Sequence, residues 1–303
     1  MLQNYRFSIA GVGGPATVKL TLEDPATYVD REGYDPSFLG PNAYVPLPTL
    51  NAVAKKDAAR VKGGGTLLDY HHFSTVHSKS RRLPMFSACN VDGKLLKKKP
   101  RSNVWHFDPR IPTDLQIVQE CYGNSDDDLF SRGHMTRRED PVWGASSLAT
   151  TAEADTFHAT NAVPQMQGHN AGIWRSLEDY VLKNAGKDKQ RACVITGPVL
   201  DKKDPKVRDV KIPVQLWKIV AFIHKDTDAL AAVGYLSSQA AFLPDTATPS
   251  FVWGQFKDLQ VPVRRIAKLT GLGFGTLLRS DVLAAADISF AFALRSEKDL
   301  LLR

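Results

Sequence analysis

The pattern of hydrophobic and polar positions along the chain predicts the strands of an antiparallel sheet. Apolar runs lie at residues 67–77, 83–92, 192–198, 214–224 and 229–236. The first two runs flank a charged tip at residues 78–82, which predicts a strand pair joined by a basic turn. A further strand is predicted to end at His134, and a short one at residues 157–160.

Three segments carry helical signals. Residues 145–155 have a helix-like composition, and residues 170–184 place apolar side chains at the spacing of one helical face. Gly186 stands where it could end that second helix. Residues 260–269 predict a helix near the end of the chain, with Pro262 in its first turn.

The first 60 residues are predicted to be an extension to the main part of the chain. Residues 5–10 and 16–22 alternate as short strands, with a glycine-rich turn between them. The proline-rich residues 28–50 read as an irregular arm that docks either on the body or on a second subunit, because proline has no backbone donor for a central sheet. With no internal repeat and no strong linker, we expect an extension at residues 1–60 and one domain at residues 61–303, which would carry the function.

Composition and charge narrow the picture only slightly. Hydrophobic residues make up 43% of the 303 positions and charged residues 23%, as in ordinary soluble domains. The formal net charge of +7 favours a polyanionic partner without identifying one. No long apolar stretch or signal peptide is evident, so we expect no membrane association and a cytoplasmic location. The three isolated cysteines fit reduced thiols better than disulfides or a zinc site.

Two charged runs have alternative interpretations. The basic run at residues 97–101 is either a solvated loop or a contact surface for phosphates. The three adjacent aspartates at residues 126–128 fit a solvated turn better than a metal site, because neighbours on a loop point in different directions.

The sequence Ser131-Arg132-Gly133-His134 holds the candidate chemistry. Hydrolysis of a phosphodiester needs a base to activate water and a cation to stabilise charge on the phosphate. A neutral His134 suits the base, and the guanidinium of Arg132 can fork onto the phosphate. A second arginine could come from the basic tip, as Arg81 or Arg82, with a slight preference for Arg82.

A metal site is expected further along the chain. Asn170 is the candidate protein ligand to Mg²⁺, because Mg²⁺ takes hard oxygen ligands and keeps most of its waters. Glu178 lies eight residues later, about 12 Å along a helix, so it fits a role in holding metal-bound waters. Helix capping by Asn170 and a solvated Glu178 are the ordinary alternatives.

These residues sit within blocks that resemble the DNA/RNA non-specific endonuclease family. The blocks occur in the family's order and span roughly residues 65 to 275: residues 131–134, 160–165, 170–178, 194–198 and 214–220. The resemblance implies an α+β fold, a central antiparallel sheet flanked by helices that contains a ββα-metal motif. The histidine would lie on a strand and the metal-binding asparagine on the following helix.

The resemblance also implies activity and roles. It implies hydrolysis of DNA and RNA with Mg²⁺ or Mn²⁺, leaving 5′-phosphate and 3′-hydroxyl ends. It assigns the base to His134, the metal ligand to Asn170, the phosphate arginine to Arg132 and the outer glutamate to Glu178. Asn161 and Gln165 match family positions that either support the metal-site loop or line the nucleic-acid cleft.

Departures from the family pattern leave alternatives open. Ser131 replaces the usual aspartate, as in a mitochondrial branch of the family, and residues 135–144 suggest a separate prokaryotic branch. One alternative is a catalytically weak protein that binds nucleic acid. Another is a toxin or defence nuclease controlled by an inhibitor or regulatory protein. A homodimer is expected by analogy only.

Overall fold

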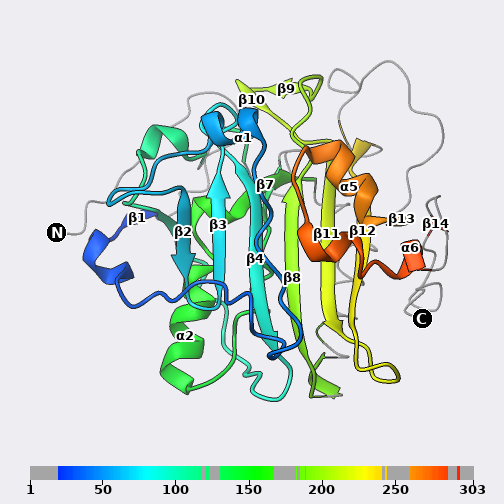
Figure 1. The fold of residues 1–303 in the computed structure, drawn as a ribbon. Helices are drawn as coiled ribbons and strands as arrows, with labels where there is room; N and C mark the ends of the chain where they lie inside the picture. Colours follow the sequence, from blue (N-terminus) through cyan, green and yellow to red (C-terminus); the bar gives the residue numbers. More distant parts are fainter. Residues whose placement is uncertain are drawn as a thin grey trace.

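An eight-stranded antiparallel sheet forms the centre of the protein (Figure 1). The structure is a computed structural model, and it describes residues 20–117, 120–122, 130–166, 182, 185–187, 189–240, 243, 259–285 and 292–293. Across the sheet the strands follow the order β14 (Phe292–Ala293), β13 (Leu259–Val261), β12 (Leu230–Ser238), β11 (Gln215–Ile223), β8 (Arg191–Pro198), β4 (Pro84–Asp92), β3 (Phe73–His77) and β2 (Leu67–Tyr70). The α+β fold class is therefore confirmed.

Most of the predicted strands form, with two corrections. The apolar run at residues 67–77 makes two strands instead of one, because a tight turn with a positive φ of 67° at His72 separates β2 from β3. The strand predicted at residues 157–160 is wrong. A 3₁₀ helix, η3 (Ala159–Asn161), occupies this region and leads directly into β7 (Ala162–Gln165).

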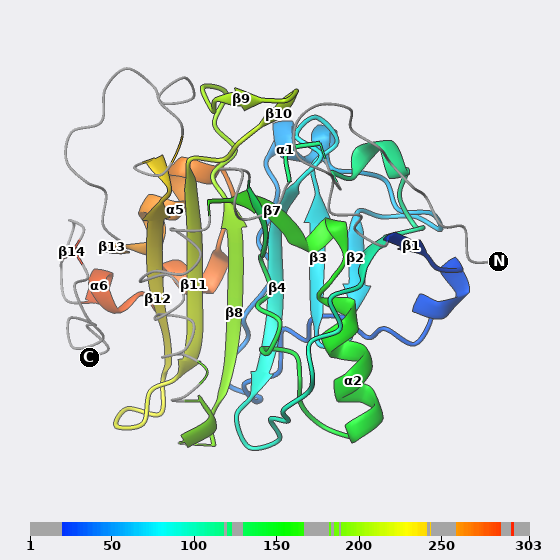
Figure 2. The same cartoon turned by 180° about the vertical axis from the view of Figure 1, so that it is seen from behind.

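The sheet is covered on both faces. On one face α1 (Ala52–Asp57), α5 (Val263–Thr270) and the 3₁₀ helix η5 (Gly275–Leu278) lie in front of the strands (Figure 1). Seen from behind, α2 (Ser146–Asp155) and β7 cover the other face (Figure 2). Each face carries its own apolar core, one containing Val76, Trp217 and Ile266, and the other Phe73, Val220 and Val163.

The predicted extension contributes to the body. Tyr34, Phe38 and Val45 are buried in the core beneath α5, and Tyr28 is buried in the opposite core. Near the chain start, β1 (Leu20–Leu22) pairs in parallel with β5 (Trp105–Phe107). The strand predicted at residues 5–10 and most of the one at 16–22 lie outside the described residues.

The helical predictions agree in part with the structure. α2 is confirmed at the predicted place, whereas the helix predicted at residues 260–269 begins at Val263, because residues 259–261 pair with β12 as β13. α5 ends at Gly271, which has a φ of 69°. The predicted helix at 170–184 lies almost wholly outside the described residues. No helix in the described ranges is long and apolar enough to cross a membrane.

Candidate active site

The candidate site is built on a small hairpin beside the central sheet. β6 (Ser131–His134) pairs antiparallel with β7, with Ser131 opposite Gln165 and His134 opposite Ala162. The strand prediction for His134 is confirmed. β6 and β7 form a two-stranded sheet of their own, separate from the central eight-stranded sheet.

The pleat of β6 sends its side chains to two opposite faces. Arg132 and His134 share one face, where both contact Trp105: its ring lies 5.7 Å from the Arg132 guanidinium and 5.1 Å from the His134 ring. Gly133 faces the other way and is covered by Gln165, whose Cδ and Oε1 occupy the space that a Cβ would need. A larger side chain at position 133 would therefore displace Gln165.

His134 sits in an aromatic and cationic environment. Its ring meets Phe157 edge-on at 4.9 Å, and its buried Nε2 has no hydrogen-bond partner among the described residues. Burial, with further contributions from the positive charges of Arg101 and Arg138, lowers the pKa of His134 to about 3. The imidazole is therefore neutral at ordinary pH and has a nitrogen available for a ligand or a proton.

Two arginines flank this histidine. Arg101 lies over the Phe157 ring at 5.0 Å, and Arg138 bonds the Lys99 carbonyl at 3.2 Å and Glu139 at 2.7 Å. In the sequence Arg101 stands out only as part of a basic run, and no pattern marks Arg138. Trp105, which contacts both predicted side chains, carries no signal in the sequence.

Arg132 is held between aromatic rings. Its guanidinium lies 4.7 Å from the Tyr122 ring, in addition to its contact with Trp105. Burial lowers the pKa of Arg132, although the group stays a cation because an arginine titrates far above neutral pH. A desolvated guanidinium of this kind interacts strongly with an oxyanion.

The side chains of Arg81 and Arg82 lie in different surroundings. Arg81 is turned inward, donating to Asp204 at 2.5 Å and to the carbonyls of Asp201 and Lys211 at 2.9 and 3.1 Å. Arg82 has 30% of its side chain exposed, pairs with Glu120 and donates to the Asp114 carbonyl at 2.7 Å.

Arg82 also lies on the same side of the molecule as Arg132. Burial raises the pKa of the Cys121 thiol, and the positive charges of Arg132 and Arg82 both oppose that rise. Both guanidinium groups therefore lie within electrostatic reach of one thiol.

Asn161 is wholly buried and fully bonded. Its Oδ1 accepts from the Thr136 amide at 2.8 Å, and its Nδ2 donates to the carbonyls of Thr136 and Thr156, each at 3.0 Å. These bonds fix the chain two residues after His134. They leave the Asn161 side chain no surface for a ligand.

Gln165 and Ser131 lie away from the His134 face. Gln165 is 1% exposed and its amide has no hydrogen-bond partner among the described residues. The Ser131 hydroxyl donates to the Gln165 carbonyl at 2.9 Å and so ties the two strands together. The atypical serine therefore acts within the hairpin.

The predicted metal ligands cannot be placed in this geometry. Asn170 and Glu178 lie outside the described residues, as do the aspartates 126–128. Among the residues that are described, no group of three or more histidine, cysteine or acidic side chains is arranged to hold a metal ion. The three cysteines are buried and unpaired with one another.

The sequence of this chain was compared with protein families and with known proteins, and both comparisons found nucleases. Residues 51–281 match the family model described as DNA/RNA non-specific endonuclease. The protein y4fB of Sinorhizobium fredii is 37% identical over 294 residues, covering 91% of this chain and 44% of y4fB. The mitochondrial nuclease EXOG of Xenopus laevis is 28% identical over 204 residues, covering 63% of this chain and 51% of that nuclease.

These relatives are longer proteins, and the solved neighbour is more distant in sequence. The chain spans about half the length of the two relatives. A crystal structure of the EndoG/EndoGI complex, described as showing the mechanism of EndoG inhibition, matches with a TM-score of 0.52 at 18% identity. That match covers 76% of this chain and 93% of the solved chain, and it bears on the fold alone.

Proposed function

Because the chain belongs to the DNA/RNA non-specific endonuclease family, we propose that it is a divalent-metal-dependent nuclease that cleaves phosphodiester bonds in DNA and RNA. One observation carries this proposal. Arg132 and His134 project from the same face of β6 onto Trp105, so a cation for phosphate and a neutral imidazole lie side by side. A phosphodiester bound to Arg132 would lie beside His134, where the imidazole could accept a proton from the attacking water.

His134 is proposed as the general base. In the free protein a pKa of about 3 makes the imidazole a weak base, since burial and two nearby arginines disfavour its charged form. A phosphodiester beside Arg101 and Arg138 would offset their positive charge. Substrate binding would therefore raise the pKa of His134 towards the range in which it accepts a proton from water effectively.

Arg132 and Arg82 are proposed as the phosphate-binding arginines. Arg132 is desolvated between two rings, which strengthens its interaction with developing negative charge. Arg82 is preferred over Arg81 because it is partly exposed on the side of Arg132, whereas Arg81 is committed to Asp204. Asn161 and Gln165 are proposed to position the hairpin, which fits their burial better than contact with nucleic acid.

The metal is proposed to bind beyond the end of β7. Asn170 follows Gln165 by five residues, a length of chain that spans at most about 18 Å when extended. An amide and a carboxylate are the hard oxygen donors that Mg²⁺ prefers, so Asn170 would hold the ion and Glu178 its waters. A bound Mg²⁺, or Mn²⁺ in its place, would stabilise charge on the phosphate and on the departing 3′ oxygen, leaving 5′-phosphate ends.

Contacts through phosphates would make recognition indifferent to sequence and sugar. The basic side chains around His134 are suited to phosphates, and no base-reading side chain is assigned among the described residues. A regulatory partner is a secondary proposal, motivated by the fold shared with EndoG, which was solved bound to EndoGI. Control by such a partner would leave the chemistry at His134 unchanged.

The test is digestion of plasmid, single-stranded DNA and RNA with Mg²⁺, Mn²⁺ or a chelator. We expect cleavage of all three with metal and a loss of at least about a hundredfold for His134→Ala. His224→Ala is the matched control. His224 lies in the turn between β11 and β12 and belongs to neither β6 nor β7. A parent protein that cleaves none of the substrates with metal would contradict the proposal.

A second comparison tests the arginine assignment. Arg82→Ala should lower kcat/KM by roughly tenfold or more with little change in stability, because it removes a phosphate contact. Arg81→Ala should mainly lower the melting temperature, because it leaves Asp204 buried without its partner. Asn170→Ala should lose activity and recover part of it at high metal concentration.

A further inference from the structure

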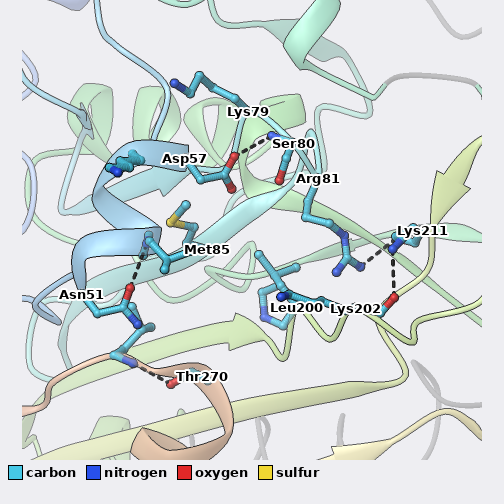
Figure 3. Close-up of a pocket in the computed structure, with 15 residues that line it drawn as sticks. Asn51, Asp57, Lys79, Ser80, Arg81, Met85, Leu200, Lys202, Lys211 and Thr270 are labelled. Atoms are coloured by element: carbon cyan, nitrogen blue, oxygen red, sulfur yellow. Dashed lines mark hydrogen bonds between the residues drawn. The ribbon is translucent and has the colours of Figure 1, made fainter.

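A cavity lies on the side of the sheet away from β6. Its volume is about 710 Å³, within the range of pockets that hold small molecules. Figure 3 shows it between α1, the β3–β4 turn, the chain that follows β8 and the end of α5. Its floor is apolar and joins the core beneath α5, through Met85, Leu200 and Leu272.

The walls of this cavity are strongly basic. Four lysines and one arginine line it, with a single carboxylate from Asp57: Lys56, Lys79, Lys202, Lys211 and Arg81. Asp57 is already used, because its carboxylate accepts from the Ser80 amide at 2.8 Å and from the Ser78 hydroxyl. Arg81 is neutralised by Asp204.

The lysines, in contrast, keep free donors. Lys56, Lys79 and Lys202 are exposed and form no ion pair with any described residue. Lys211 donates once, to the Lys202 carbonyl at 2.9 Å, and an ammonium group has two further donors. Four lysines that line one cavity make its electrostatic potential positive, which favours binding of an anion.

The size and floor of the cavity define the anion further. A lone inorganic phosphate would use the lysines but leave the apolar floor uncovered. A purely apolar molecule would bury the floor without neutralising the lysines. An organic phosphate of mononucleotide size satisfies both, because its phosphate meets the ammonium groups and its ring and sugar cover Met85, Leu200 and Leu272.

We propose that this cavity is a binding site for an organic monophosphate of mononucleotide size, separate from the site of hydrolysis. The same chemistry occurs in a free nucleotide and at the 5′-phosphorylated end of a strand. The site lies on the opposite face of the sheet from His134, so it binds its ligand without sharing residues with the hairpin. It does not depend on the protein being a nuclease.

The experiment measures binding by titration calorimetry on the full chain in chelator, which keeps hydrolysis out of the readout. The probes are adenosine 5′-monophosphate, adenosine, inorganic phosphate and a 5′-phosphorylated oligonucleotide. The test variant is Lys56→Ala/Lys202→Ala. The matched control is Lys55→Ala/Lys203→Ala, which removes the same charge from adjacent exposed lysines that do not line the cavity.

We expect the nucleotide to bind more tightly than phosphate or adenosine, and the test variant to weaken it by roughly tenfold or more. The control should stay within about twofold of the parent. Tighter binding of the oligonucleotide than of the free nucleotide would identify a strand end as the source. Equal losses in both variants, equal affinity for inorganic phosphate, or no nucleotide binding at millimolar concentration would each overturn the proposal. A protein that binds the nucleotide but cleaves no nucleic acid would contradict only the proposed function.

Discussion

The side chain of Gln165 lies directly across Gly133, in the space that any larger residue at position 133 would need. The two residues belong to paired strands, β7 and β6, and their contact lies on the face of β6 opposite His134. Packing of Gln165 on the opposite face therefore helps to fix the position of β6, the strand that carries the proposed base. The backbone of Gly133 has no positive φ, so its conformation does not favour glycine. The lack of space beside Gln165 does.

Gly133→Ala should disturb both stability and activity. The added methyl group would overlap Gln165, and overpacking of this kind typically costs about 1–3 kcal/mol. Because His134 is the next residue, we also expect a fall in kcat. Denaturant unfolding and plasmid digestion provide the measurements.

The double variant Gly133→Ala/Gln165→Ala is the control for that prediction. It removes the overlap, so it should recover much of the stability, and the two substitutions should be non-additive. If the losses of unfolding free energy in Gly133→Ala and in Gln165→Ala simply added up in the double variant, the contact would not position β6.

Asn161→Ala should lower the free energy of unfolding strongly, for a different reason. It removes three hydrogen bonds and leaves the buried Thr136 amide and two carbonyls without partners, at a cost of about 2–5 kcal/mol. Asn161→Asp keeps the acceptor for the Thr136 amide but turns a buried carboxylate oxygen towards the two carbonyls, so it should be at least as destabilising as Asn161→Ala. Unfolding curves for the three proteins would rank them, and equal stability of Ala and parent would contradict this account.

The sequence predicted local features well and spatial neighbours poorly. Alternation identified the strands around Trp217 and Val194 because their side chains pack against the sheet's own cores. It missed the turn at His72, because a histidine with positive φ leaves no mark in an apolar run. Trp105 and Arg138 approach His134 from distant segments, and a single sequence carries no information about such contacts.

The predicted division at residue 60 can be tested by a neighbouring pair of residues. Val45 is 0% exposed and belongs to the core beneath α5, whereas Tyr44 is 55% exposed. Val45→Ala should therefore lower the unfolding free energy by about 2 kcal/mol, and Tyr44→Ala by less than about 0.5 kcal/mol. If both were neutral, residues 1–60 would be an appendage that folds independently of the body.

Buried histidines should make the protein sensitive to acid. Burial lowers the pKa of His158 to about 3 and the pKa values of His72 and His77 to about 4. An unfolded histidine titrates near 6.5, so the unfolded chain binds more protons below that pH. The contribution of these neutral histidines to the free energy of unfolding should be fully present above pH 6.5. Below that pH the free energy of unfolding should fall by up to about 1.4 kcal/mol per pH unit for each such histidine.

The measurement is urea unfolding between pH 7.5 and 5.5. His77→Gln should show a shallower loss than the parent, because it removes one of these histidines. An unfolding free energy that stays constant or rises over this interval would contradict the assignment of neutral buried imidazoles.

The charge around His134 should govern the acid limb of activity. The neutral imidazole is the proposed active form, and a pKa of about 3 in the free protein places the loss of kcat/KM from its protonation near that pH. Arg101 is the larger of the two charge contributions that lower this pKa. Arg101→Gln should therefore raise the pKa of His134 and move the acid limb to higher pH, whatever it does to the maximal rate. Lys98→Gln, an exposed change in the same basic run, should leave the limb in place. Ring-proton NMR titration gives a second reading, and a His134 resonance that titrates near pH 6.5 in the parent would contradict the effect of burial and of Arg101.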